Sequence, residues 1–175
     1  MTEWIARAKA LGFDTAAVMD PRQLEVRADV RQMCAADRCG AYGRNWTCPP
    51  AVGTLEACRA RLGQYRRGLL VQTVGHMAKP IDSRCYRETE RRHNEHFSAL
   101  AAEVRRGHPD ALCLGAGGCR VCRPCAYPAP CRFPEQAIPG MEAYGLFVTQ
   151  VCRDAGVPYH HGERTITYTA CILVK

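Results

Sequence analysis

The sequence contains no apolar run long enough to cross a bilayer as a helix, so a membrane-spanning protein is not expected. Charged residues are scattered through the first ten positions, and this pattern does not match a secretory signal. Both absences predict a cytoplasmic protein without a membrane partner. The 175 residues suit one domain, so residues 1–175 are expected to form a single metal-binding unit.

Several catalytic signatures are also missing. The chain has no P-loop, and its glycines at 115–118 do not match the dinucleotide fingerprint, so phosphate cofactors are not indicated. It has no G-x-S-x-G elbow and no H-E-x-x-H motif. The C-x3-C-x2-C spacing of radical S-adenosylmethionine enzymes is absent too. The sequence therefore leaves open whether the protein is an enzyme.

Lysine is scarce: it occurs three times, and the net charge of +7 comes mainly from arginine. Between residues 84 and 106 the arginines alternate with glutamates, a pattern typical of a solvent-exposed helix face. Nucleic acid is therefore not the expected partner, although the surface is basic. A redox partner protein or a small-molecule ligand is expected instead.

Cysteine, in contrast, is abundant: the chain has twelve. Four follow the spacing C-x2-C-x2-C-x5-C, and they are Cys119, Cys122, Cys125 and Cys131. This spacing is close to that of bacterial ferredoxin ligands and predicts a 4Fe-4S cluster. Zinc is the alternative, although zinc sites usually use two separated C-x2-C pairs. Disulfides are disfavoured because these cysteines are too close in sequence and a reducing cytoplasm is expected.

A second group consists of Cys34, Cys39 and Cys48. Three thiolates predict a second cluster, which either keeps one open iron or takes its fourth ligand from a distant residue. Cys58, Cys85 or a histidine is a candidate for that fourth place. The cysteines outside both groups are expected to pack as small hydrophobic residues; they are Cys58, Cys85, Cys113, Cys152 and Cys171.

Four sequence blocks carry a family resemblance. They are C-x4-C-G-A-Y-G-R-N-W-T-C-P-P-A-V-G (34–53), G-A-G-G-C-R-V-C-R-P-C (115–125), P-C-R-F-P-E (130–135) and G-M-E-A-Y-G-L-F-V (140–148). Together they resemble a prokaryotic family of predicted metal-binding proteins, the domain of unknown function 2284. The resemblance covers nearly the whole chain and implies metal binding through the seven grouped cysteines. It implies no reaction.

Hydrophobic periodicity predicts alternating helices and strands. Helices are expected over 3–11, 55–67, 83–106 and 141–155, with Thr54 as the N-cap of the second. Strands are expected over 13–19, 68–77, 110–115 and 165–174, and residues 22–33 are read as extended or helical. These elements predict an α/β fold, a small mixed sheet of about four strands flanked by helices. The cysteine-rich loops are expected to lie outside that sheet.

Two functional classes follow from these observations. The first is an iron–sulfur protein with one or two 4Fe-4S clusters that acts in electron transfer or as a redox accessory to a partner enzyme. The second is an enzyme that uses an open iron at Cys34, Cys39 and Cys48 as a Lewis acid on a small substrate. A zinc-stabilised interaction module is a weaker alternative. Glu142 is either an acid or base near a cluster, or a first-turn carboxylate of the helix predicted over 141–155.

Overall fold

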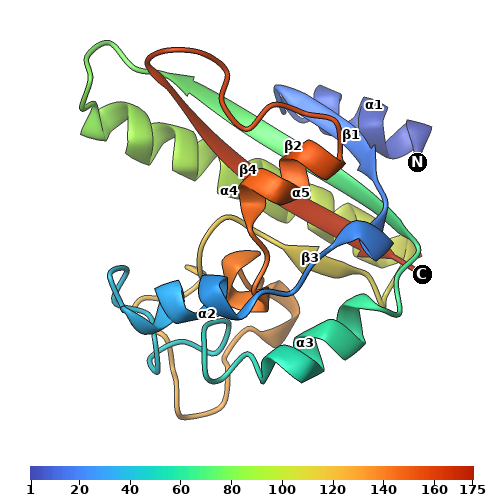
Figure 1. Cartoon of the computed structure of the whole chain (residues 1–175), viewed down its shortest axis with the longest axis vertical. Helices are drawn as coiled ribbons and strands as arrows, with labels where there is room; N and C mark the ends of the chain where they lie inside the picture. The colour runs from blue at the N-terminus through green and yellow to red at the C-terminus, as the bar shows by residue number, and fades with distance from the viewer.

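The computed structural model describes residues 1–175 and confirms the predicted α/β class (Figure 1). The strands are β1 (Thr15–Met19), β2 (Arg67–His76), β3 (Leu112–Leu114) and β4 (Thr165–Val174). The α-helices are α1 (Thr2–Ala10), α2 (Ala28–Ala35), α3 (Leu55–Leu62), α4 (Ser83–Gly107) and α5 (Val148–Asp154). Three short 3-10 turns are η1 (Pro21–Gln23), η2 (Pro134–Gln136) and η3 (Glu142–Tyr144). None of the helices combines the length and apolarity that crossing a membrane requires.

The four strands form one sheet in the order β1-β2-β4-β3, and every neighbouring pair is antiparallel. The predicted sheet was mixed, whereas the observed sheet has only antiparallel neighbours. Strands β2 and β3 do run in the same direction and are joined by α4, as a crossover connection would place them. However, β4 lies between them and is antiparallel to both, so the sheet contains no adjacent parallel pair.

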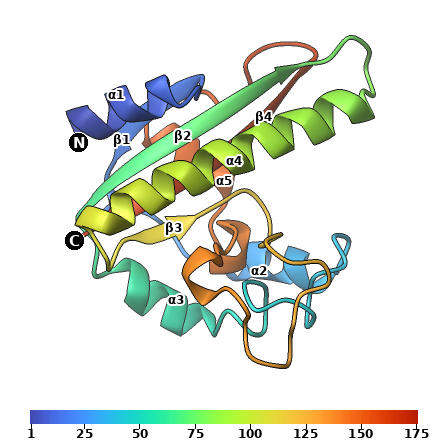
Figure 2. The same cartoon turned by 180° about the vertical axis from the view of Figure 1, so that it is seen from behind.

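Alternate residues of the strands supply two separate cores, because successive side chains point to opposite faces of a sheet. One face carries Leu69 and Ile172 and is covered by α1 and α4, as Figure 2 shows from behind. The other face carries Leu70 and Leu173 and packs against α3, η3 and α5. Residue Phe97 of α4 belongs to the first core. The apolar stripe that Phe97, Leu100 and Val104 form on α4 is therefore the side that faces the sheet.

Two predicted helices differ from the structure. The helix predicted over 141–155 is wrong as one element, because Gly145 adopts a φ of 76° in the left-handed region and separates η3 from α5. The helix predicted over 55–67 ends earlier, at Leu62. Its N-cap is as predicted, since the Thr54 hydroxyl accepts a hydrogen bond of 3.2 Å from the backbone N–H of Ala57.

The cysteines outside the two groups are mostly core residues. Four of them are buried: Cys58, Cys113, Cys152 and Cys171. The fifth, Cys85, is partly exposed near the start of α4. All twelve cysteines of the chain are free thiols, which agrees with the expected absence of a disulfide framework.

Candidate metal centre

The 119–131 cysteine loop belongs to a long excursion that leaves the sheet after β3. Both ends of the excursion meet at a narrow neck, where Gly115 pairs with Gly140 in a parallel bridge. The backbone N–H of Gly115 donates to Pro139 at 2.8 Å, and the N–H of Met141 donates to Gly115 at 3.0 Å. In Figure 2 the excursion is the gold and orange loop that extends from the lower part of the molecule. The loop therefore lies outside the sheet, as predicted.

The other three cysteines lie on and after α2. Cys34 is in the last turn of that helix, and Cys39 follows in a turn that Asp37 begins with a φ of 48°. The Asp37 carboxylate fixes this turn, because it accepts a hydrogen bond of 2.9 Å from the backbone N–H of Tyr42 and pairs with Arg44. Cys48 comes at the end of the same loop. The helix end and the Asp37 turn thus bring the chain around so that the three cysteines face a common space.

That space is a pocket of about 310 Å³, lined by all three cysteines of the group. Cys48 is buried, Cys34 is half-buried and Cys39 is exposed. Apolar side chains from α2 and from the cysteine loop form much of the wall, including Val30, Met33, Tyr42 and Pro49. The backbone of Gly117 and Gly118, from the excursion, closes another side.

The two cysteine loops interlock. The Thr47 hydroxyl accepts a hydrogen bond of 2.9 Å from the backbone N–H of Cys119, and the Asn45 side-chain amide donates to the Cys119 carbonyl at 3.0 Å. The indole N–H of Trp46 donates to the Ala129 carbonyl at 2.9 Å. A Cβ added at Gly118 would lie 2.9 Å from the Cys48 sulfur, so the loops approach closely there. The structure thus brings together two groups whose relation the sequence left open.

The Trp46 ring also meets the ring of Tyr127 edge to face, with centroids 5.0 Å apart. Edge-to-face contact is a favoured geometry for aromatic pairs. Trp46 therefore joins the loops by packing as well as by its hydrogen bond. In the sequence, only the run N-W-T directly before Cys48 marked this junction. The partners of these three residues could not be identified without the structure.

Charged and polar groups surround the 119–131 loop. Arg120 forms a salt bridge of 2.7 Å with Glu90 on α4, and Arg132 donates to the Pro124 carbonyl at 2.6 Å. Burial acts to raise the pKa of Cys125, but backbone N–H groups of Tyr127, Trp46 and Ala126 hydrogen-bond to its sulfur and bring the pKa below its usual value. Such N–H groups also stabilise a metal-bound thiolate.

The pKa values of Cys34 and Cys48 in the pocket are shifted in the opposite direction. Burial, followed by the charge of Cys39, raises the pKa of Cys48 to about 11. Burial, followed by the charge of Glu142, raises the pKa of Cys34. Without a cation these thiols are neutral at pH 7, whereas a coordinated metal removes the proton from a thiol. The pocket therefore favours thiolates only together with a positive group.

Zinc and an iron–sulfur cube require different arrangements of donor atoms. No three side chains of histidine, cysteine, aspartate or glutamate converge as the ligands of one metal ion would. A zinc ion holds its sulfur ligands at about 2.3 Å and so requires them around one point. An iron–sulfur cube places each thiolate at a different corner, which spreads the ligands further apart. The three thiols line a pocket of about 310 Å³.

Other residues considered as ligands lie elsewhere. Cys58 and Cys85 do not line the pocket, and neither does any histidine. His93 is a fully buried residue of α4, and its Nδ1 lies 2.9 Å from the Thr73 hydroxyl. His161 lies 3.2 Å from the Gln72 side chain. Both histidines therefore have roles in packing and loop anchoring.

The sequence left two alternative roles for Glu142. It sits in η3 and lines the pocket with the three cysteines, and the Cys34 sulfur lies 3.8 Å from its carbonyl oxygen. Although the pocket leaves the side chain accessible to water, protein atoms surround the carboxylate, and this burial raises its pKa. Because η3 is a single short turn, the alternative role as the first-turn carboxylate of a long helix does not apply.

Fold and site together define a cysteine-rich metal-binding protein of the α/β class. The chain belongs to the family described as "Predicted metal-binding protein (DUF2284)", which it matches over residues 17–174. Searches of the curated proteins and of the solved structures gave no match. Family membership supports metal binding in general. It does not identify the metal.

Proposed function

We propose that this chain is a cytoplasmic iron–sulfur protein that acts in electron transfer or as a redox accessory to a partner enzyme. One 4Fe-4S cluster is held by Cys119, Cys122, Cys125 and Cys131. A second is held by Cys34, Cys39 and Cys48. When bound, these clusters supply one-electron transfer. The proposal treats residues 1–175 as one unit, in keeping with the interlocked loops.

The observation that carries the proposal is the direct contact of the two loops. Two redox groups in loops joined by the Thr47–Cys119 hydrogen bond lie close enough to form a relay within one chain. The cysteines of the 119–131 loop are only half-buried, which favours exchange with a partner at the surface. Arg120, Arg123 and Arg132 in this loop compensate part of the negative charge of thiolate ligands.

The pocket favours the second candidate, an enzyme with an open iron at Cys34, Cys39 and Cys48. A space of about 310 Å³ beside three candidate ligands is large enough for a small substrate. The two candidates are compatible in one molecule if the 119–131 cluster delivers electrons to the pocket. A zinc-stabilised module receives less support, because no single point gathers the ligands that zinc needs.

Metal analysis of anaerobically purified protein tests the proposal. We expect a brown protein with iron and acid-labile sulfide, about four of each per occupied cluster. Cys122→Ala is expected to lose the iron of the 119–131 loop, and Cys39→Ala the iron of the pocket. Stoichiometric zinc without labile sulfide would exclude the iron–sulfur assignment. A protein that keeps its iron but shows reversible redox change at neither group would exclude electron transfer.

A further inference from the structure

One short turn presents a single carboxylate to the cysteine pocket. In the segment 141–144, Met141, Ala143 and Tyr144 are buried, with 0%, 6% and 3% of their surface exposed. Glu142 alone among them is exposed, and it lines the pocket beside Cys34, Cys39 and Cys48. The turn therefore packs into the core through three residues and leaves the fourth exposed between the cysteine pocket and a second pocket that Tyr159 lines.

The backbone of this turn is held on several sides. The N–H of Met141 donates to Gly115 at 3.0 Å at the neck of the excursion, and the N–H of Leu146 donates back to Met141 at 3.1 Å. Gly145 has a φ of 76°, and a Cβ added there would lie 2.9 Å from the Arg27 carbonyl oxygen. Since the turn is fixed between the neck and the start of α2, the position of Glu142 at the pocket is fixed as well.

Glu142 forms no salt bridge, although Arg38 lines the same pocket. The arginine and lysine salt bridges of the structure pair other carboxylates, such as Glu90 with Arg120 and Asp37 with Arg44. Glu142 takes part in none of them. A carboxylate partly removed from water without a charged partner is costly, unless a metal or another positive group meets it.

The other candidates for a fourth ligand do not reach the pocket. Cys58 is 2% exposed on α3, and its sulfur lies 3.4 Å from the Arg31 guanidinium. Cys85 borders a different pocket, near the start of α4. Cys119 follows Gly118 directly, but it borders the neighbouring pocket against α4. Among the lining residues other than the three cysteines, Glu142 is the only one with a carboxylate.

We propose that the Glu142 carboxylate is the fourth ligand of the cluster held by Cys34, Cys39 and Cys48. This inference rests on the proposed function. A carboxylate oxygen is a harder donor than a thiolate and is less suited to iron–sulfur clusters. The corner that it closes is therefore the one that exchanges with outside ligands. With Glu142 in that place, an outside anion would compete with its carboxylate for the fourth position.

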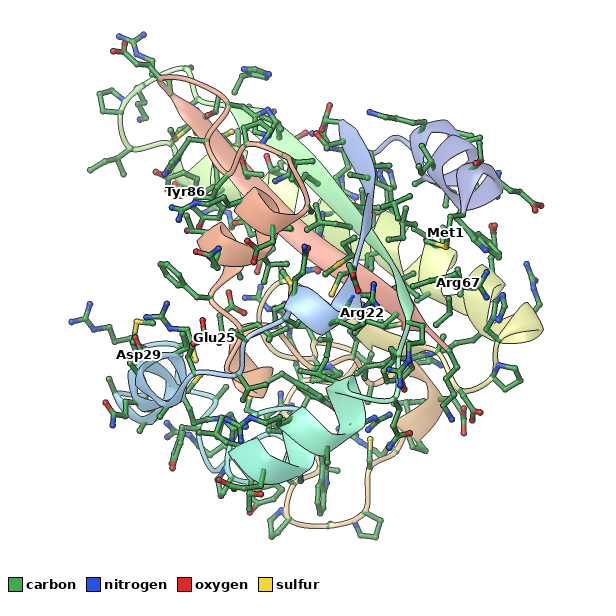
Figure 3. All side chains as sticks on the ribbon, turned by 45° about the vertical axis from the view of Figure 1, so that its right-hand side comes forward. Met1, Arg22, Glu25, Asp29, Arg67 and Tyr86 are labelled. Atoms are coloured by element: carbon green, nitrogen blue, oxygen red, sulfur yellow. The ribbon has the colours of Figure 1, made fainter.

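The test uses the full-length chain with Cys122→Ser, which silences the 119–131 cluster and leaves the pocket cluster to be observed. Three changes are made at Glu142: Glu142→Ala, Glu142→Gln as a variant of equal size, and Glu142→Cys. Glu25→Gln is the matched control, because Glu25 is an exposed carboxylate just before α2, labelled in Figure 3. Iron is counted during mild oxidation under anaerobic conditions, and electron paramagnetic resonance is recorded in the reduced state.

We expect Glu142→Ala and Glu142→Gln to lose one iron at least roughly tenfold faster than the parent, since loss of a ligand weakens metal binding by that order. Glu142→Cys is expected to lose it more slowly than the parent, and Glu25→Gln at the parent rate. An unchanged rate and spectrum in both Glu142→Ala and Glu142→Gln would overturn the inference. So would an equal effect from Cys119→Ser in the same background, which would assign the fourth place to that thiol. Absence of iron and sulfide from the parent itself would instead refute the proposed function.

Discussion

Thr47 and Cys119 are 72 residues apart in the sequence, and the hydroxyl of the first accepts a hydrogen bond of 2.9 Å from the backbone N–H of the second. Thr47 is nearly buried, with 5% of its surface exposed. The bond ties the residue before Cys48 to the first cysteine of the other group. It is therefore the shortest structural connection between the two candidate clusters.

Replacement of Thr47 by valine tests this connection. Valine keeps the shape of threonine but cannot accept the hydrogen bond, so we expect Thr47→Val to cost about 1 kcal/mol in the free energy of unfolding. We also expect iron to leave the 119–131 loop faster. Urea unfolding and the rate of iron release to a chelator measure the two effects. Thr149→Val, on α5 away from both loops, is the control and should change neither value.

Gly118→Ala tests the close approach of the loops. The added Cβ would lie 2.9 Å from the Cys48 sulfur, so the thiol or the adjoining loop must shift. We expect this variant to keep its fold and to lose metal from the Cys34, Cys39 and Cys48 group. Circular dichroism and metal content give the readout. Gly107→Ala is the control, since a Cβ at Gly107 meets no atom within 4 Å; equal metal content in the two variants would contradict the prediction.

Substitution of a buried cysteine distinguishes a role in packing from a role in metal binding. Cys171 is fully buried, and burial raises its pKa far above the usual range, so it remains a neutral thiol. We expect Cys171→Ala to keep all bound metal and to lose roughly 1–3 kcal/mol of stability through packing. Metal analysis and thermal unfolding of the same sample measure both. Loss of metal in this variant comparable to that in Cys122→Ala would show that the assignment of ligands is wrong.

His93 makes stability depend on pH. Burial, followed by the charge of His96, lowers the pKa of His93 to about 3 from the ordinary 6.5. Below pH 6.5 the unfolded chain therefore binds a proton at this residue while the folded chain does not, and the free energy of unfolding falls as pH decreases toward 3. The expected fall is at most about 1.4 kcal/mol per pH unit from this group.

Urea unfolding at pH 7.5, 6 and 5, compared between the native chain and His93→Gln, measures this contribution. The pH dependence of the native chain should be steeper below pH 6.5, because glutamine does not titrate. The variant is expected to be less stable at pH 7.5, where it loses the contact between His93 and Thr73. Parallel pH profiles of the two proteins would rule out a role for His93.

The sequence predicted those features that depend on local patterns. The β-branched run at 165–174 forms the ten-residue strand β4, and the apolar stripe of α4 identified its buried face. The helix over 141–155 was wrong because helical periodicity does not reveal that Gly145 must take a left-handed conformation. The sequence predicted a mixed sheet and gave no direction for individual strands. The insertion of β4 between β2 and β3 was not predicted, because it depends on a strand far along the chain.

The candidate site shows the same limit. The spacing of Cys119, Cys122, Cys125 and Cys131 identified the residue types that the chemistry needs, and the family match supports metal binding. The role of Thr47 was not predictable, and a place near a cluster was only one of two alternatives for Glu142, since each depends on contacts between segments about 70 to 110 residues apart. Sequence spacing carries no information on which loops touch.

The composition of the two cores has a consequence for how the protein matures. Neither core contains any of the seven cysteines of the two groups, so the frame of sheet and helices can pack before metal arrives. In that case metal binding follows folding as a separate step, unlike in small metal domains that fold only with the metal bound.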